Sequence, residues 1–345
     1  MSEGMEHLFV INPQSFGTNL RGVRESMDAI TAEIKAYFVG KEEKYTIHIS
    51  RYPRNAIVAI RRYFKNLAAD TRVRVYAVGG DGMAFDCLNG IVGMSNVELA
   101  IIPYGTGSDF VRAFGPEHYL EFRNLTAQTS ASTIPVDVIK CNGKYALNFC
   151  SVGVESVAAI KIIPLFKRFK RLRRSFPFFN RVFFLIGAIL AQFEKRVIGQ
   201  EYGIFADGEN VSGSYLGINI ANAPYYGDGL SAVSSAVPDD GLMDMLITKK
   251  MHIFAAFASL AKFVSGGWRL LSKHFIFRRI KQVSIRSTKP LSVNLDGEVF
   301  FDTFLDIEIL PHLVNIVNVT GAGFKRLDKP FSEDSAKEGG VRFHE

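Results

Sequence analysis

The feature that most constrains the fold of this sequence is a strict alternation of short β-branched runs and amphipathic stretches over about the first 134 residues. Strands and helices that alternate in this way predict βαβ units, a parallel sheet and helices on both sheet faces. The expected strands are residues 7–12, 45–50, 72–78 and 97–102, and the expected helices are residues 22–37, 55–69 and 82–91. We therefore expect an N-terminal, doubly wound, Rossmann-like α/β domain.

The pattern changes after about residue 135, where short strands follow one another closely. Three tight hairpin turns are indicated by Asn142-Gly143, Asp207-Gly208 and Asp296-Gly297, because these pairs supply the positive φ angles that such turns need. The expected strands are residues 134–141, 144–150, 201–206, 213–221, 243–248, 282–286 and 291–295. Helical insertions are expected near 156–196 and 251–270. This part predicts an antiparallel β-sandwich.

These two patterns set the expected domain boundaries in a chain of 345 residues, a length that suits two domains of ordinary size. The α/β domain should span residues 1–134 and be joined by about residues 308–327, which return through a strand at 316–319. The β-sandwich domain should span 135–307. Residues 328–345 are charged and poor in apolar side chains, so we expect a disordered tail.

Charge, cysteine content and apolar run length restrict the setting of the protein. The formal net charge of +7 favours anionic partners such as nucleotides, nucleic acid or a membrane surface. The three cysteines form no CxxC pair, which argues for a reducing compartment and against a disulfide scaffold or a zinc site. The longest uncharged apolar stretch, residues 182–193, is shorter than the ~20 residues of a membrane span. We expect a cytoplasmic protein, free or peripheral to the membrane.

Two glycine-rich turns from strand to helix carry the strongest functional signal. The first is Gly79-Gly80-Asp81-Gly82, and the second, about 25 residues later, contains Gly105-Thr106-Gly107 before a helix expected near Ser108 or Asp109. Glycines let the backbone approach a ligand closely, and exposed amides at a helix start attract phosphate oxygens. Two such turns in one parallel sheet should lie side by side at its carboxyl edge, where open α/β sheets bind ligands. An ordinary tight turn is the alternative for the first segment alone.

Neither turn matches a common nucleotide motif. The third glycine of the dinucleotide fingerprint is missing, and the chain has no Walker lysine–serine pair. The carboxylate of Asp81 within a phosphate-binding turn is explained if it holds Mg²⁺ or a ribose or phosphate hydroxyl. The pair of turns therefore predicts a phosphate site of another kind.

The sequence resembles the diacylglycerol kinase catalytic-domain family, in its soluble bacterial-type lipid kinase form. Six segments match in the family's order over roughly residues 8–325. They are Asn12-Pro13, Gly79 to Gly82, Pro103 to Phe110, Asn148 to Gly153, Pro238 to Asp244 and Leu295 to Glu298.

The resemblance implies roles for particular residues. The family's glycine-rich loops bind ATP, which implies a nucleotide site at Asn12, Ser50, Gly79, Gly80, Asp81, Gly82, Gly105 and Thr106. A structural Mg²⁺ is implied at the Asp240 carboxylate and the carbonyls of Val237 and Leu242, a ligand set that suits a hard cation. Glu298 falls at the position of the family's general base, with Asp296 as a metal or orientation partner. Taken alone, Asp-Gly-Glu is also simply a good hairpin turn.

The sequence departs from the family pattern at four positions. Met83 replaces a threonine, Phe85 and Asp86 replace an asparagine and a glutamate, and Ser108 replaces an asparagine. The lost threonine hydroxyl removes one contact available to phosphate or Mg²⁺. These changes motivate one alternative, a catalytically weakened regulator that binds lipid or nucleotide.

The segment Lys161–Arg181 indicates how an acceptor is reached. It carries eight lysines and arginines interleaved with five phenylalanines, and no acidic residue occurs between Glu155 and Glu194. Basic side chains with aromatic neighbours suit an anionic membrane surface. A solvated helix face is the plain alternative. We expect no nucleic-acid partner, because no RNA-binding module accompanies the segment.

The combined prediction is an ATP- and Mg²⁺-dependent lipid kinase that transfers the γ-phosphoryl group to a lipid hydroxyl at the inter-domain cleft. A diacylglycerol-like lipid and a sphingoid base both remain open as the acceptor. A NAD kinase-like enzyme with a soluble acceptor is the other alternative, since these enzymes share the Gly-Gly-Asp-Gly loop. The sequence gives no prediction of the oligomeric state.

Overall fold

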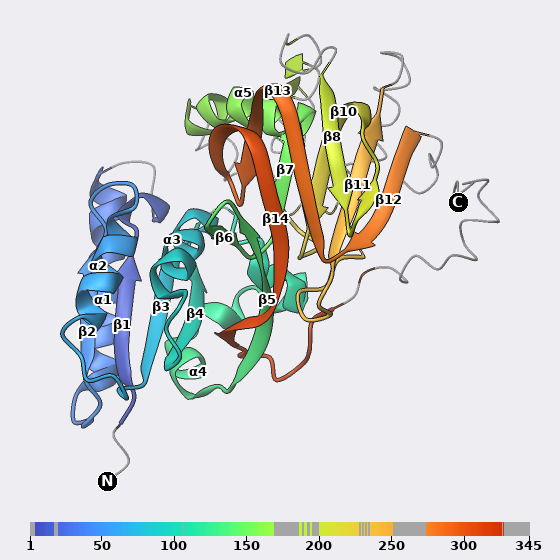
Figure 1. The fold of residues 1–345 in the computed structure, drawn as a ribbon. Coiled ribbons are helices and arrows are strands. Elements are labelled where there is room, and N and C mark those ends of the chain that lie inside the picture. Colours follow the sequence, from blue (N-terminus) through green and yellow to red (C-terminus); the bar gives the residue numbers. More distant parts are fainter. Residues whose placement is uncertain are drawn as a thin grey trace. The chain divides into compact units, whose positions relative to one another are not determined.

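The chain forms two compact units (Figure 1). The structure is a computed structural model that describes residues 4–16, 20–105, 107–168, 186–187, 190–191, 194, 200–227, 229, 231, 233, 235–250, 274–325 and 327. Unit 1 comprises Met1–Asp137 with Pro311–Phe324, and unit 2 comprises Val138–Leu310 with Lys325–Glu345. Two strands, β5 (Thr133–Cys141) and β14 (Glu298–Val317), each begin in one unit and end in the other.

Unit 1 is an α/β domain built on a parallel sheet with the strand order β2-β1-β3-β4-β14. Its other strands are β1 (Glu6–Ile11), β2 (Tyr45–Ile49), β3 (Val73–Gly79) and β4 (Val97–Pro103). Its α-helices are α1 (Leu20–Phe38), α2 (Asn55–Phe64), α3 (Asp81–Ile91) and α4 (Leu125–Ser130). Short 3-10 helices are η1 (Pro13–Ser15), η2 (Phe110–Phe114), η3 (Pro116–His118) and η4 (Glu121–Arg123). The predicted N-terminal fold class is confirmed.

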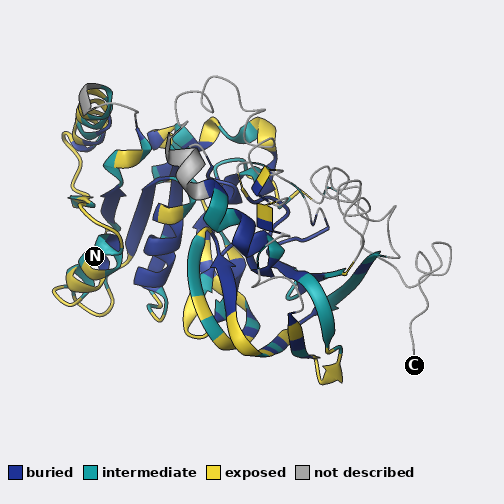
Figure 2. Cartoon of the chain, turned by 90° about the horizontal axis from the view of Figure 1, so that it is seen from above, coloured by how far each residue is buried: buried dark blue, intermediate teal, exposed yellow. Residues whose placement is uncertain are grey.

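The inner strands β1, β3 and β4 of unit 1 are buried because they are apolar on both faces, whereas the edge strand β2 is partly exposed. Figure 2 shows neighbouring strands of this sheet coloured as buried. One face packs against α1 through a cluster that includes Phe9, Tyr76 and Ile34. The alternate residues along the strands, such as Val10 and Val75, are equally buried on the opposite face. Helix α3 packs against β1, β3 and β4, and α2 packs against α3.

The order of the strands marks a ligand-binding position in unit 1. Strand β1 lies between β2 and β3, so the chain leaves β1 toward one side of the sheet and comes back on the other side. In open α/β sheets, ligands bind at the carboxyl ends of the strands where the direction of winding reverses. The carboxyl ends of β1 and β3 are therefore the expected place for a ligand.

Unit 2 is the predicted antiparallel β-sandwich. Strands pair in the order β12-β11-β10-β7-β13-β14, and β8 pairs with both β10 and β13. Its strands, apart from β5 and β14, are β6 (Lys144–Ala146), β7 (Phe149–Gly153), β8 (Glu201–Ala206), β9 (Glu209–Asn210), β10 (Gly213–Ala221), β11 (Met243–Lys249), β12 (Phe275–Ile280) and β13 (Gln282–Leu295). Helix α5 (Val154–Arg168) follows β7 directly.

The three predicted hairpin turns are present. Asn142, Asp207 and Asp296 have φ angles of 46°, 47° and 48°, and each is followed by a glycine with φ between 77° and 89°. Two consecutive positive φ angles give the two-residue turn whose twist matches that of the flanking strands.

Several element boundaries differ from the predictions. Predicted strands 282–286 and 291–295 form one strand, β13, with a register shift between Arg286 and Leu291. Predicted strand 144–150 is divided into β6 and β7, because the amides of Leu147 and Asn148 bond to a side chain rather than to a neighbouring strand. The basic strand β12 and most of β14 were not predicted, because their charged residues interrupt the alternation of apolar and polar side chains that indicates a strand.

The helix predicted near Ser108 or Asp109 is a 3-10 helix, η2, and neither side chain caps it. Ser108 has a positive φ of 61°, in the left-handed region that non-glycine residues rarely adopt. The second predicted insertion, residues 251–270, and the predicted tail, residues 328–345, lie outside the described residues. Within the described part of the chain, no helix combines the length and the apolar character that crossing a bilayer requires.

Candidate active site

Predicted nucleotide residues from three neighbouring strands meet at the carboxyl edge of unit 1. Asn12 follows β1, and its backbone N–H donates to the carbonyl of Val78 in β3 at 3.0 Å. Ser50 follows β2, and its N–H donates to the carbonyl of Ile11 at 2.8 Å. The side chain of Asn12 accepts a hydrogen bond from Gln14 N at 3.0 Å and so begins η1. These backbone bonds hold Asn12 beside the end of β3, where the first glycine turn begins, and Ser50 beside the end of β1.

The two glycine turns lie against each other, as the sequence predicts. The amides of Tyr104 and Gly105 both donate to the carbonyl of Gly79, at 2.9 and 3.0 Å. A Cβ atom at Gly105 would lie 2.4 Å from the Cα of Gly80, so the approach of the two backbones requires glycine. Gly82 has open space where a side chain would stand. Thr106 lies outside the described residues.

Asp81 joins the two turns through its carboxylate. It accepts hydrogen bonds from the backbone amides of Ser108 at 2.8 Å and Asp109 at 2.6 Å. The Ser108 hydroxyl donates to the Gly79 carbonyl at 3.1 Å, which adds a second link. Charge-assisted bonds of this kind are among the stronger hydrogen bonds in proteins. Asp81 therefore fixes the geometry of the edge; its predicted contact with Mg²⁺ or a hydroxyl stays a prediction.

The departures from the family pattern are accommodated by packing in unit 1. Met83 and Phe85 are each 3% exposed and are therefore part of the packed interior of unit 1. Asp86 forms an ion pair of 2.6 Å with Arg54, whose guanidinium also stands 4.8 Å from the centre of the Phe85 ring. Asp86 and Phe85 thus hold the positively charged guanidinium of Arg54 at the start of α2, beside the carboxyl edge.

Arg54 was not among the site residues predicted from the sequence. It precedes α2 with a positive φ of 65°, a conformation that non-glycine residues rarely adopt. Because the loop that contains it follows β2 in sequence, Arg54 belongs to the same sheet edge as Ser50. The only signal in the sequence is the acidic Asp86, which replaces a glutamate within α3.

In unit 2, the predicted catalytic hairpin joins β13 to β14 at Asp296 and Gly297. The Asp296 carboxylate is 5% exposed and accepts hydrogen bonds from three consecutive amides, those of Leu147 at 2.7 Å, Asn148 at 3.1 Å and Phe149 at 2.9 Å. Glu298 pairs with Leu295 across the turn and is partly exposed. Asp296 thus anchors the hairpin, whereas the Glu298 side chain is partly exposed.

The predicted Mg²⁺ loop is held by ion pairs. Asp240 pairs with the guanidinium of Arg279, which also bonds to Asp244 at 3.1 Å. The other Asp240 oxygen accepts from the amide of Leu242 at 3.2 Å. A cation bound here would have to share the Asp240 carboxylate with Arg279. Among the described residues, no three His, Cys, Asp or Glu side chains gather as a metal site would require.

A row of buried polar side chains crosses the β-sandwich, and the sequence did not predict it. Asn219 in β10, Ser151 in β7 and Asn294 in β13 are paired in register across three adjacent strands. The Asn219 amide donates to Glu155 of α5 at 2.6 Å. Burial raises the pKa of Glu155 to about 7, and the bond from Asn219 offsets part of that rise.

We expect Glu155 to make stability fall as the pH rises. Below about pH 4.5 the Glu155 carboxyl is protonated in the folded and in the unfolded chain, so its burial does not lower the free energy of unfolding. Between about pH 4.5 and 7 the carboxyl ionises in the unfolded chain but stays protonated in the folded one, which stabilises the unfolded chain. The loss of unfolding free energy should reach about 3 kcal/mol above pH 7. Glu155→Gln should remove it, so the variant is more stable than the parent at pH 8 and nearly equal near pH 4.5. Urea unfolding across this pH range, with exposed Glu201→Gln as control, measures the difference; parallel pH curves for parent and Glu155→Gln would contradict it.

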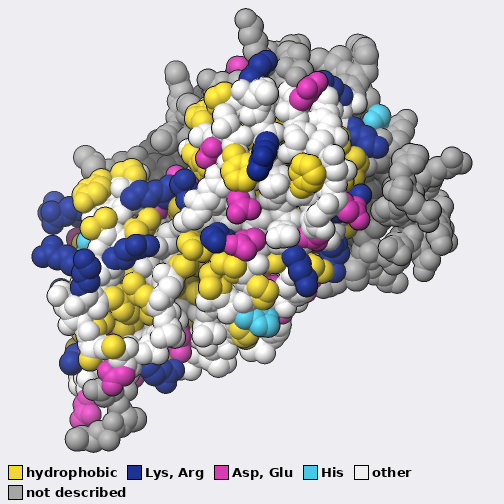
Figure 3. Space-filling view, in the orientation of Figure 1, with side chains coloured by type: hydrophobic (Ala, Val, Ile, Leu, Met, Phe, Trp, Pro, Cys, Tyr) yellow, Lys and Arg dark blue, Asp and Glu magenta, His cyan; other side chains and the backbone are white. Residues whose placement is uncertain are grey.

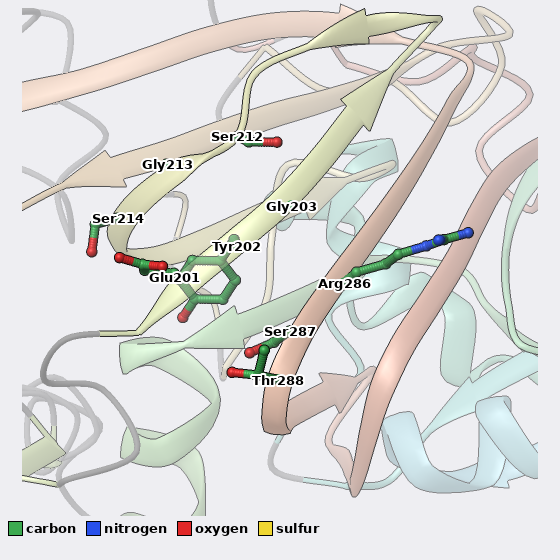
Figure 4. Close-up of a pocket in the computed structure, with 9 residues that line it drawn as sticks. All are labelled: Glu201, Tyr202, Gly203, Ser212, Gly213, Ser214, Arg286, Ser287 and Thr288. Atoms are coloured by element: carbon green, nitrogen blue, oxygen red, sulfur yellow. The ribbon is translucent and has the colours of Figure 1, made fainter.

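A groove of about 660 Å³ on unit 2 contains none of the predicted site residues (Figure 4). It is lined by Glu201, Tyr202, Gly203, Ser212, Gly213, Ser214, Arg286, Ser287 and Thr288. Figure 4 shows the Arg286 side chain extending away from Glu201; its guanidinium stands 4.9 Å from the centre of the Phe304 ring. The charged groups of this groove therefore do not converge on one ligand.

Comparison with known proteins assigns both parts of the chain. Residues 6–141 match the diacylglycerol kinase catalytic domain, and residues 181–318 match the YegS C-terminal NAD kinase beta sandwich-like domain. Two of the similar curated proteins, both named "Putative lipid kinase", come from Staphylococcus aureus strains JH9 and Newman. Each is 24% identical over 258 residues, which is 74% of this chain and 80% of the relative.

Solved structures show the same fold. A crystal structure of "a putative diacylglycerol kinase" from Bacillus anthracis str. Sterne covers 90% of this chain and 96% of its own, with 22% identity and a TM-score of 0.65. A second structure from the same organism covers 92% and 98%, with 21% identity and a TM-score of 0.65. The fold is thus that of two-domain kinases with an α/β domain and a β-sandwich domain. The chain thus carries a diacylglycerol kinase catalytic domain, followed by a YegS-type C-terminal β-sandwich domain.

Proposed function

We propose that this protein is an ATP-dependent lipid kinase that transfers the γ-phosphoryl group of ATP to a lipid hydroxyl. The observation that carries the proposal is the contact between the glycine turns at Gly80 and Gly105, where backbone lies directly against backbone at the carboxyl edge of unit 1. Backbone amides at such an edge suit the phosphates of a nucleotide. Asn12 and Ser50 lie at the same edge and add an amide and a hydroxyl.

Glu298 is the proposed general base. It would accept the proton of the acceptor hydroxyl as the oxygen attacks the γ-phosphorus and ADP leaves. The hairpin beside Glu298 is anchored by the hydrogen bonds of Asp296, which fix the backbone from which the Glu298 side chain extends. A diacylglycerol-like lipid or a sphingoid base is the proposed acceptor class.

Mg²⁺ is the proposed cation, and it would neutralise phosphate charge when it is bound with ATP. The Asp240 carboxylate with the Val237 and Leu242 carbonyls offers oxygen ligands of the type Mg²⁺ prefers. Since Arg279 already pairs with Asp240, a structural cation there would bind weakly. Attachment to an anionic membrane through Lys161–Arg181 also belongs to the proposal; most of that segment lies outside the described residues.

The test is a kinase assay with radiolabelled ATP and Mg²⁺ over diacylglycerol, sphingosine, a glycolipid and NAD. We expect label in a lipid, and Glu298→Gln should lower the rate by about 100-fold or more, as expected for loss of a general base. Glu308→Gln, on the same strand β14 but in an ion pair with Lys140, is the matched control and should keep activity.

Each other outcome of the assay rejects the proposal. Label in NAD alone would assign the chain to soluble-acceptor kinases. ATP binding without transfer to any substrate would favour a regulator, and a Glu298→Gln variant with parental activity would remove Glu298 from the mechanism.

A further inference from the structure

A basic surface of unit 1 has no role in the site described above. Between Lys44 and Ala69 the chain carries six lysines and arginines and no acidic residue. This stretch contains the loop after β2 and helix α2. We name as the α2 face five exposed side chains: Arg51, Tyr52, Val58, Arg62 and Lys65. Val58, Arg62 and Lys65 are spaced by four and three residues and therefore lie on one side of the helix.

No described protein group forms an ion pair with the cations of the α2 face. In the described part of the chain, Arg51, Arg62 and Lys65 form no ion pair. By contrast, exposed Lys44 and Arg72 elsewhere on unit 1 pair with Glu6 and Glu98. The positive charge of the α2 face is therefore available to an external anion.

Apolar side chains are interleaved with these cations. Tyr52 and Val58 are each 59% exposed, and Ile49, at the end of β2, is 37% exposed. The opposite side of α2 is buried through Ala56 and Ile60, so the exposed apolar residues are not needed for packing. Figure 3 shows Lys and Arg side chains together with hydrophobic ones over the region where α2 lies in Figure 1.

We propose that the α2 face docks this protein on an anionic membrane surface. Negative lipid headgroups attract the unpaired cations, and Tyr52 and Val58 can enter the interfacial layer, where amphipathic side chains are stable. A nucleic acid would use the cations but not the exposed Val58. Ser50 and Arg51 are adjacent, so docking also brings the carboxyl edge of unit 1 toward the lipid. The inference rests on the proposed lipid kinase function and adds to it a surface separate from Lys161–Arg181.

The test is co-sedimentation of the full chain with phosphatidylcholine vesicles that contain or lack phosphatidylglycerol. The variant Arg51→Gln/Arg62→Gln/Lys65→Gln should weaken binding to the anionic vesicles by at least about tenfold. The matched control Lys250→Gln/Lys281→Gln/Lys289→Gln removes the same charge from exposed positions of unit 2 and should change binding by less than about twofold. A second variant, Tyr52→Ser/Val58→Ser, keeps the charge and should also weaken binding. Thermal unfolding confirms that each variant folds.

The outcomes separate this inference from the proposed function. Equal losses in the two triple variants would show an effect of net charge alone and overturn the inference, as would parental binding by the first. Binding of single-stranded RNA that depends on the same three cations, without vesicle binding, would assign the surface to nucleic acid and overturn it too. Kinase activity toward a short-chain lipid dispersed in detergent should survive the substitutions. A chain that docks through the α2 face but phosphorylates no lipid would reject the proposed function and retain the docking surface.

Discussion

Asp296→Ala should lower the free energy of unfolding by about 5 kcal/mol, because it leaves three buried amides without an acceptor and each unsatisfied donor costs about 1–3 kcal/mol. These are the amides of Leu147, Asn148 and Phe149, which the carboxylate collects at the break between β6 and β7. Urea unfolding measures the loss. Asp296→Asn keeps one acceptor oxygen and should lose about half as much.

Asp207→Ala is the matched control for this prediction. Asp207 occupies the same turn position, with a φ of 47°, and its carboxylate also accepts two backbone amides, those of Lys281 and Gln282. It is exposed, so water can replace it and the loss should stay near 1 kcal/mol. Equal losses at the two positions would show that burial of the amides is not the cause.

Gly105→Ala should lower stability by about 4 kcal/mol and reduce kinase activity by at least about 100-fold. The added Cβ would stand 2.4 Å from Gly80 Cα and 2.9 Å from Gly80 N, and no side chain can rotate to relieve a clash between backbones. The two turns must separate, which also weakens the bonds that Asp81 makes to Ser108 and Asp109. Thermal unfolding and the ATP assay measure the two effects.

Gly82→Ala distinguishes a damaged fold from a blocked ligand at the same turn. Gly82 lies in the first turn of α3 with nothing within 4 Å of an added Cβ. The variant should fold at least as stably as the parent, since alanine favours helix over glycine by about 1 kcal/mol. Weaker ATP binding by this folded variant supports a nucleotide at the turn.

The Gly105→Ala prediction is contradicted if that variant unfolds at the parental temperature, because the two turns could then separate without loss of stability.

The fold of unit 1 could be predicted because its signals are local. Each strand is a short apolar run, each helix has an apolar stripe, and Gly79-Gly80 and Gly105 mark where strand passes to helix. The contact between the turns follows from the parallel pairing of β3 and β4. The hairpins at Asn142, Asp207 and Asp296 were equally local, because two residues decide each turn.

The parts that could not be predicted depend on contacts between distant residues. The break between β6 and β7 exists because Asp296, about 150 residues later, takes the amides of Leu147 and Asn148. Glu155 meets Asn219 only once the sandwich has formed. The role of Asp81 as a link between turns was likewise hidden, since a carboxylate in a glycine turn reads first as a ligand for a cation.

Strand β14 has a consequence for how the protein is made on the ribosome. Its last residues, Asn315 and Ile316, pair with β4 and provide the final strand of the sheet in unit 1, where Val317 joins the core. Until that segment is synthesised, the outer edge of β4 exposes unpaired amides and carbonyls, which invite pairing with other chains. The first 137 residues can therefore adopt most of their sheet early, but the nascent domain stays open to aggregation until Asn315 and Ile316 have emerged and paired with β4.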